Sequence, residues 1–161
     1  MATLRCAHAD DRALLHAWNS QAHVADAAGI WDWDAELEGL RDGVAPWREL
    51  FIYEAQGRPL GFVQILDPEL EPTRYWGDLC HARALDLWIG PEDQLRRGHG
   101  SKLLELALAR CFADPRVDHV WVDPLASNVR ARAFFEKHGF TFVEQRVMDG
   151  DDTAVYVLAR P

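Results

Sequence analysis

Two glycines directly before an apolar helical pattern mark the segment of this chain with the clearest capacity for chemistry. Gly98 and Gly100 lie in a turn that leads into that pattern. A helix N-terminus presents backbone N–H groups without intrahelical acceptors and the positive end of the helix dipole, so it attracts anions such as phosphate. Glycine also permits positive φ and close approach of a ligand, and Arg96 and Arg97 add positive charge. The segment therefore predicts a phosphate-binding turn, although glycine pairs before helices are often plain turns.

Two familiar phosphate loops are excluded by the spacing of these residues. A P-loop requires glycine followed directly by lysine, whereas Ser101 separates Gly100 from Lys102. A dinucleotide-binding fingerprint requires a third small residue at position 103, which is Leu103. The turn must therefore bind its anion in another structural setting.

Two aspartates stand at positions where a carboxylate needs an explanation. Asp86 lies within the otherwise apolar segment 84–89, where a carboxylate is costly unless it is paired or functional. Asp123 follows the apolar segment 120–122, at a strand end where sites often lie. The alternatives are an exposed position for Asp86 on an alternating face and a turn-making role for Asp123 before Pro124.

The surrounding pattern predicts one domain over residues 1–161. Strands are expected over residues 2–7, 49–55, 60–66, 82–89, 120–122, 141–146 and 154–159. Helices are expected from residue 10, from about residue 35 to residue 42, onward from the glycine turn, and over residues 129–138. The polar connection over residues 67–81 is long enough to suggest a function of its own.

Composition narrows the class of protein and the kind of partner. The net charge of −9 opposes binding to nucleic acid and favours a cationic ligand, although an acidic surface also serves solubility. We expect a cytoplasmic protein without a membrane partner, since the sequence has no long apolar run and no signal-peptide pattern. The three cysteines and seven histidines lack metal-ligand spacing, so no metal site is expected.

The order of elements after residue 48 resembles the GNAT superfamily of acetyl-CoA-dependent N-acetyltransferases. The resemblance covers residues 48–160 and rests on the Gly-x-Gly turn, the Asn128-x-x-Ala131 helix and the ending Phe134-Phe135-Glu136-Lys137-x-Gly139-Phe140. It implies an α/β (α+β) fold, with a mixed central sheet of six to seven strands flanked by about four helices. It also implies that acetyl-CoA is the cosubstrate and that it contacts Leu87, Trp88, Ile89, Arg96, Arg97, Gly98, His99, Gly100, Ser101 and Asn128.

A narrower set of residues resembles the aminoglycoside 6'-N-acetyltransferases. The shared segments are Asp123-Pro124-x-x-Ser127-Asn128, Phe112-x-Asp114-Pro115 and Ala154-Val155-Tyr156, together with the tryptophan segment 31–33. This resemblance implies that Asp86 acts on the acceptor amine and that Asp123 holds a substrate ammonium. The residues expected to bind the acceptor are Trp31, Trp76, Asp78, Asp86, Asp123 and Asp151.

The expected reaction is direct attack of an amine on the thioester, because no nucleophilic triad is legible in the sequence. Asp86 and Trp88 are the expected catalytic residues, since a strand N–H near Trp88 would stabilise the oxyanion. Two departures from the family pattern stand out. Leu95 replaces the usual Gln or Arg before the turn, and Phe135 replaces the tyrosine that protonates the leaving thiolate, with Tyr156 as a possible substitute.

Two other functions remain open from the sequence. The chain could acetylate a different amine, such as a siderophore precursor, a polyamine or a protein N-terminus. It could instead bind acyl-CoA as a sensor without turnover, because Phe135 cannot donate a proton. A small cationic amine is the expected partner in the first case, and the chain is expected to be a monomer or a homodimer.

Overall fold

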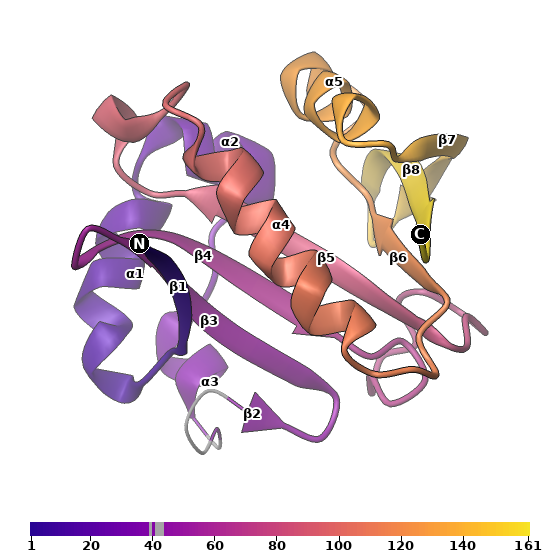
Figure 1. The fold of residues 1–161 in the computed structure, drawn as a ribbon, viewed down its shortest axis with the longest axis horizontal. Coiled ribbons are helices and arrows are strands. Elements are labelled where there is room, and N and C mark those ends of the chain that lie inside the picture. Colours follow the sequence, from indigo (N-terminus) through magenta and orange to yellow (C-terminus); the bar gives the residue numbers. More distant parts are fainter. Residues whose placement is uncertain (39, 41–43) are drawn as a thin grey trace.

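The computed structural model describes residues 1–38, 40 and 44–161, and its strands form one mixed sheet (Figure 1). The strands are β1 Ala2–Cys6, β2 Val44–Ala45, β3 Arg48–Ala55, β4 Arg58–Leu66, β5 Ala82–Ile89, β6 His119–Val122, β7 Thr141–Met148 and β8 Asp151–Ala159. Seven of them follow the spatial order β1-β3-β4-β5-β6-β8-β7, and β2 pairs with β3 outside this path. The pairing of β5 with β6 is parallel, and the other pairings are antiparallel.

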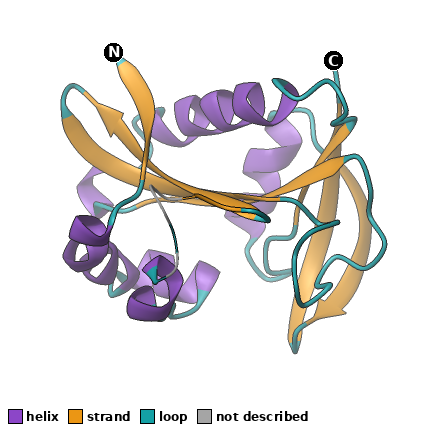
Figure 2. Cartoon of the chain, turned by 90° about the horizontal axis from the view of Figure 1, so that it is seen from below, coloured by secondary structure: helices purple, strands orange, loops and turns teal. Residues whose placement is uncertain are grey.

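Helices cover both faces of the sheet (Figure 2). They are α1 Arg12–Asn19, α2 Ala22–Ala28, α3 Trp33–Leu37, α4 His99–Phe112 and α5 Val129–Lys137, with short 3-10 turns at Ala9–Asp11 and Glu92–Gln94. Within the described part of the chain, no helix has both the length and the apolar character needed to cross a membrane.

The alternation of side chains along β3 and β4 divides the core into two layers. Tyr53 and Val63 pack with α4 on one face, in a cluster that includes Leu104. Ile52 and Phe62 pack with α1, α2 and α3 on the other face. Successive strand residues point to opposite faces, so one apolar hairpin supports both helical layers.

The expected sheet is confirmed, and the helical layer differs from expectation in two places. Helix α2 was not expected, because its short alanine-rich sequence buries only Val24 and shows no apolar stripe. Helix α3 begins at Trp33 instead of residue 35, since Asp32 accepts a hydrogen bond from the N–H of Ala35. The expected continuation of this helix to residue 42 falls largely outside the described residues. The structure therefore has five α-helices in its described part, where about four were expected.

The two parallel strands separate soon after they begin. Only three residue pairs join β5 to β6, ending at Ala84 opposite Trp121. Beyond β6 the chain turns to β8, where the N–H of Ala154 donates to Pro124 and the N–H of Ala126 donates to Asp152, both at 2.8 Å. The last five residues of β5 therefore have no strand beside them on this edge.

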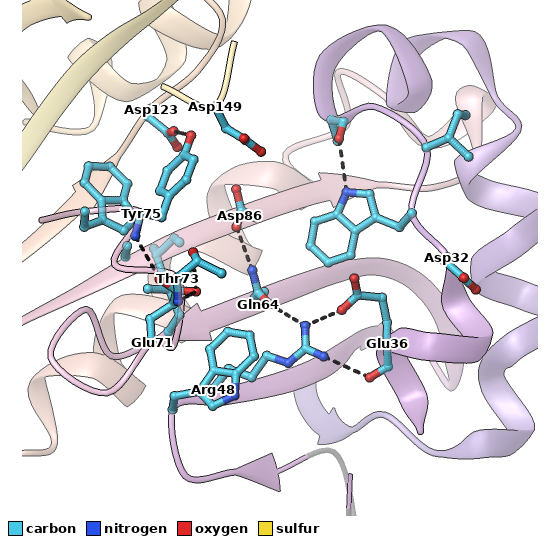
Figure 3. A pocket seen from close by; sticks show the side chains of 18 residues that line it. Asp32, Glu36, Arg48, Gln64, Glu71, Thr73, Tyr75, Asp86, Asp123 and Asp149 are labelled. Carbon is cyan, nitrogen blue, oxygen red and sulfur yellow. Dashed lines mark hydrogen bonds and ion pairs between the residues drawn. The ribbon is translucent and has the colours of Figure 1, made fainter. Parts of the chain in front are cut away.

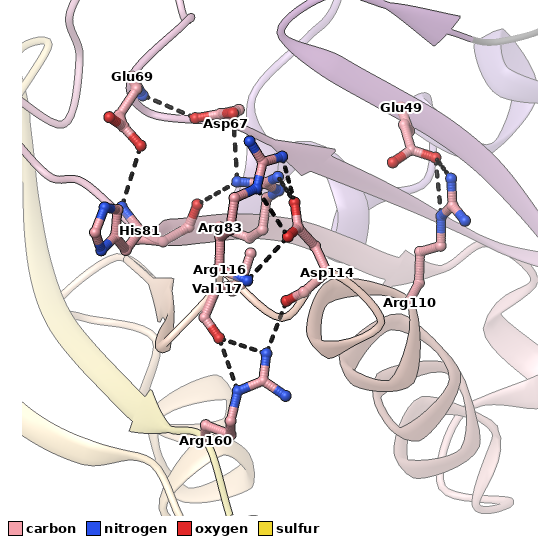
Figure 4. Close-up of polar contacts among 11 residues, drawn as sticks. Glu49, Asp67, Glu69, His81, Arg83, Arg110, Asp114, Arg116, Val117 and Arg160 are labelled. Carbon is pink, nitrogen blue, oxygen red and sulfur yellow. Dashed lines mark hydrogen bonds and ion pairs between the residues drawn. The ribbon is translucent and has the colours of Figure 1, made fainter.

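A polar cluster fixes the closed end of this opening (Figure 4). Arg83, at the start of β5, forms ion pairs with Asp67 and Asp114, both at 3.3 Å. Arg160, beyond β8, donates to the carbonyl oxygen of Phe112, the last residue of α4, and to that of Val117 in the loop that follows. Cations at a helix C-terminus are favoured by the helix dipole. The cluster therefore joins β5, α4 and the C-terminal end of β8 where the two strands are still paired.

Candidate active site

An acidic cavity of about 560 Å³ lies beside β5 on the face that α1, α2 and α3 cover (Figure 3). Four aromatic residues line it, namely Trp31, Trp47, Tyr75 and Trp76. Among the described residues, six carboxylates also line it, namely Asp32, Glu36, Glu71, Asp86, Asp123 and Asp149, together with one basic residue, Arg48. A cavity lined by one sign of charge concentrates the opposite charge, so this one favours cations.

A chain of hydrogen bonds fixes the orientation of Asp86 (Figure 3). Arg48 is held by Glu36 and donates to the side-chain oxygen of Gln64 at 3.0 Å. The amide of Gln64 must then present its nitrogen to Asp86, and it donates to Oδ2 at 2.8 Å. Burial raises the pKa of Asp86, and the hydrogen bond from Gln64 opposes that rise.

Asp123 reaches the same cavity from the end of β6. The hydroxyl of Tyr75 donates to its Oδ2 at 2.5 Å. Burial and the nearby charge of Asp86 raise the pKa of Asp123 to about 7. Two carboxylates that share a site repel each other when both are ionised, so they share a site most favourably when a proton or a cation lies between them.

Six residues were expected to bind the acceptor. Four of them, Asp123 included, line this cavity, and two do not. Trp31, Trp76 and Asp86 line the cavity. Asp78 is fully exposed and forms an ion pair with Arg74, so its expected contact with the acceptor is not supported. Asp151 is exposed at the start of β8, and Asp149 lines the cavity in its place.

A second cavity, of about 470 Å³, lies beside the open edge of β5, between residues of α2 and residues of α4 and α5. Most of its wall is apolar, and it is lined by Leu87, Trp88, Ile89, Leu95, Gly100, Leu125, Ala131 and Phe134, with His23, Asp26, Ala27, Ser127, Asn128 and Arg130. Leu87, Trp88, Ile89, Gly100 and Asn128 are five of the residues expected to contact the cosubstrate. Asn128 also caps α5, because its side-chain oxygen accepts from the N–H of Ala131 at 3.1 Å.

The N-terminus of α4 has the geometry of an anion site. Gly98 precedes the helix with φ of +84°, which favours glycine, and Arg96 also has positive φ. The first hydrogen bond of the helix runs from the N–H of Lys102 to Gly98. The N–H groups of residues 99–101 therefore lack intrahelical acceptors.

Five of the expected cosubstrate residues lie in this turn and do not line the second cavity. They are Arg96, Arg97, Gly98, His99 and Ser101. The ring of His99 forms a hydrogen bond with Tyr53, and the hydroxyl of Ser101 forms one with His138. The turn therefore offers its backbone N–H groups to a ligand more readily than these two side chains.

A narrow space of about 110 Å³ connects the two cavities. Asp86 and Asp123 line both this neck and the acidic cavity, while Trp88 and Asn128 line both the neck and the second cavity. Molecules bound in the two cavities would therefore meet at the neck, beside Asp86.

The open edge of β5 determines which backbone groups face the opening. The N–H of Gly90 donates to Leu60 of β4 at 2.9 Å. Because hydrogen-bonding direction alternates along a strand, the N–H of Trp88 also faces β4, and those of Leu87 and Ile89 face the opening. The N–H of Trp88 was expected to stabilise the oxyanion, but it is the N–H groups of its two neighbours in β5 that face the opening. Of these two neighbours, Leu87 lines the neck.

The structure does not supply a tyrosine at the neck. Phe135 lines it and has no proton to donate. Tyr156, the substitute suggested by the sequence, is fully buried, and its hydroxyl donates to Glu136 at 2.6 Å and accepts from Arg132. Burial raises the pKa of Tyr156, and these contacts are those of a structural residue.

Several residues of the site were not expected from the sequence. Gln64 carries the same signal that identified Asp86, a single polar residue in an apolar strand. Arg48, Tyr75 and Asp149 carry no such signal, because they come from a strand end, a long loop and a turn. The buried amide of Asn19 supports the wall of the cavity, because it holds the main chain at Gly29 and Trp31 and the indole of Trp33.

Comparison with known proteins links this architecture to one family. Residues 7–148 match the model of the family described as acetyltransferase (GNAT) domain. Aminoglycoside N(6')-acetyltransferase type 1 from Klebsiella pneumoniae is 27% identical over 164 residues, which cover 97% of this chain and 81% of that protein. A kanamycin resistance protein from Rhizobium radiobacter is 34% identical over 91 residues, which cover 55% of this chain and 83% of that protein.

Solved structures show the same fold. The aminoglycoside acetyltransferase AAC(6')-Ib in complex with coenzyme A aligns with a TM-score of 0.88 and 24% identity, covering 99% of this chain and 95% of that chain. The same enzyme in complex with coenzyme A and kanamycin aligns with a TM-score of 0.83 and 23% identity, over 99% and 95% of the two chains.

The raised pKa of Asp123 predicts that the acidic cavity lowers stability as pH rises. The folded state keeps a proton on this carboxyl up to about pH 7, whereas the unfolded chain releases it near 3.8. The folded state therefore binds more protons between these values, and stability falls as pH increases through this window. Replacing Asp123→Asn should remove this loss, so the stability of the variant relative to the parent should rise as pH increases from about 4 to about 7.

Urea unfolding of both proteins at several pH values measures this difference. Asp78→Asn is the matched control, since Asp78 is fully exposed and the same substitution there removes a solvated carboxylate. A constant difference between Asp123→Asn and the parent across the pH range would contradict the raised pKa.

Proposed function

Because the chain belongs to the GNAT acetyltransferase family, we propose that it transfers the acetyl group of acetyl-CoA to a primary amine of a polycationic small molecule, with the 6'-amine of an aminoglycoside as the preferred acceptor. The observation that carries this proposal is the pair of cavities joined at Asp86, one acidic and one largely apolar. The similarity to aminoglycoside N(6')-acetyltransferases and to a kanamycin resistance protein supports the choice of acceptor.

Acetyl-CoA is assigned to the second cavity and to the turn before α4. The N–H groups of residues 99–101 would bind its pyrophosphate, with Arg96 and Arg97 contributing charge. The open edge of β5 would bind the pantetheine arm, because Leu87 and Ile89 direct backbone groups to that side. The carbonyl oxygen of Ile89 already accepts a hydrogen bond from His23, at 2.8 Å, so Leu87 has the more available groups.

The aminoglycoside is assigned to the acidic cavity. Arg48, the basic residue among those that line this cavity, is neutralised by Glu36, so the other carboxylates set the local charge. An ammonium group between Asp86 and Asp123 would relieve their repulsion and would make charge-assisted hydrogen bonds. The aromatic walls, Trp31 and Trp76 among them, offer faces to cations and to sugar rings.

The proposed chemistry is direct transfer at the neck. The neutral amine nitrogen attacks the thioester carbon, and the oxyanion that forms is stabilised by the N–H of Leu87. The nitrogen loses a proton to Asp86, the carbon–sulfur bond breaks to give the amide, and Asp86 returns that proton through water to the departing CoA thiolate, which leaves as the thiol. Burial raises the pKa of Asp86, which makes its carboxylate a stronger base than that of an exposed aspartate. Orientation of the two substrates can supply about 7–11 kcal/mol of the barrier reduction.

A thiol-release screen tests the substrate class and the regiochemistry. The acceptors are two kanamycin-like compounds that differ only in the presence of the 6'-amine, spermidine, and a peptide with a free N-terminus. We expect CoA release with the compound that carries the 6'-amine and a rate near background for the other three. Equal rates for the two kanamycin-like compounds would refute the 6' position, and turnover of spermidine or peptide alone would refute the aminoglycoside.

Asp86→Asn should separate chemistry from cosubstrate binding. The asparagine can still accept the hydrogen bond from Gln64, but it cannot take a proton, so kcat should fall at least about tenfold, or about 1.4 kcal/mol of barrier. Calorimetry should show unchanged affinity for acetyl-CoA. Asp78→Asn is the control and should keep the parent rate. Parent turnover in Asp86→Asn would remove this carboxylate from the mechanism.

Gly98→Val tests the phosphate-binding turn. A side chain at φ of +84° is strained, and the turn would have to move away from the position that presents its N–H groups. We expect acetyl-CoA affinity to fall more than about tenfold. Gly57→Val is the matched control, because Gly57 has φ of +72° and equally open surroundings in the turn between β3 and β4. Equal affinity in the two folded variants would exclude the turn from cosubstrate binding.

A further inference from the structure

Strand β7 forms one edge of the sheet and exposes apolar side chains to solvent. It pairs with β8 on one side, and no other strand of the described residues lies beyond it. Seven large hydrophobic residues are exposed in the described part of the chain, and three of them, Phe142, Val143 and Val147, belong to β7. Val147 is 71% exposed. Long edge strands with exposed apolar residues are templates for pairing with another strand.

The edge strand at the opposite end of the sheet differs. Strand β1 has five residues, and four of them are partly buried. The eight residues of β7 are mostly exposed, and none is a proline or a lysine. The usual devices that protect an edge strand are therefore weak in β7, although a bulge interrupts its pairing with β8 near Val143.

The hydrogen bonds of β8 show which backbone groups of β7 are available. The N–H of Ala154 donates to Pro124, away from β7. Ala154 lies opposite Gln145, so this pair is not joined by backbone hydrogen bonds. By alternation, the N–H and C=O of Gln145 and Val147 point outward at the edge, while those of Arg146 point to β8.

We propose that β7 pairs antiparallel with β7 of a second copy of this chain, about a twofold axis at Gln145. This register makes Gln145 opposite its own copy a hydrogen-bonded pair, as the outward groups require. Glu144 and Arg146 form an ion pair within one chain. This register also brings Glu144 opposite Arg146 of the partner subunit, twice by symmetry, and Val143 opposite Val147 of the partner subunit. Opposite charges and apolar pairs across strands both stabilise pairing.

Neighbouring registers are disfavoured by the same side chains. A twofold axis at Glu144 would place this carboxylate opposite its own copy, and an axis at Arg146 would place two guanidinium groups opposite each other. Like charges directly opposite destabilise a strand pair. Charge therefore favours the axis at Gln145 over an axis at either neighbouring residue, and the interface at this axis is self-complementary.

A cysteine at the axis tests the register directly. In a Cys80→Ser background, which removes the exposed native thiol, Gln145→Cys should form a disulfide-linked dimer under mild oxidation. A hydrogen-bonded antiparallel pair has Cα atoms about 5.5 Å apart, within disulfide range. Val147→Cys is the matched control, because its partner is residue 143 of the second copy, and it should stay monomeric on the same gel. Equal crosslinking of both variants, or of neither, would overturn the register.

Sedimentation of the whole chain over a concentration series tests the dimer without crosslinking. Glu144→Arg alone should raise the dimer dissociation constant at least about tenfold, since each like-charge pair occurs twice. Glu144→Arg with Arg146→Glu should restore it, because the reversed charges are again complementary. Thermal melts at low concentration check that each variant folds. A chain that stays monomeric at all concentrations, or a dimer indifferent to both charge variants, would overturn the proposal.

Discussion

The separation of two parallel strands is the constraint on which the rest of the structure depends. Strand β5 is paired with β4 from Ala84 to Ile89, but β6 leaves β5 after three residue pairs because the chain beyond β6 binds to β8. This opening exposes one backbone edge of β5 and lets the two cavities meet at the neck. A fully paired sheet would separate the two cavities, so the proposed reaction site depends on this incomplete pairing.

The acidic cavity buries two carboxylates, which a protein interior normally excludes. Asp86 and Asp123 lie close together in a partly buried cavity, and each raises the cost of ionising the other. The chain Glu36–Arg48–Gln64 orients one carboxylate, and Tyr75 orients the other. This arrangement reduces stability at neutral pH, and a cationic ligand offsets the loss. Burial of like charges is therefore a specificity device, because it favours ligands that carry positive charge.

The sequence contained most of the fold and part of the site. Period-two alternation and turn residues located the strands, and the turn at Gly98 located α4, because these signals are local. Helix α2 lacked an apolar stripe and was missed. Asp86 could be identified because it interrupts an apolar strand, whereas Tyr75 and Asp149 depend on how a long loop and a distant turn fold over the cavity. Such long-range placement leaves no periodic signal in the sequence.

The central claim is that both substrates occupy the joined cavities together and react without an acyl-enzyme. Initial rates measured over a matrix of acetyl-CoA and aminoglycoside concentrations test this most directly. Simultaneous binding on the two sides of the neck predicts double-reciprocal lines that intersect. Parallel lines, the pattern of an enzyme that is acetylated first and releases CoA before the amine binds, would contradict the account.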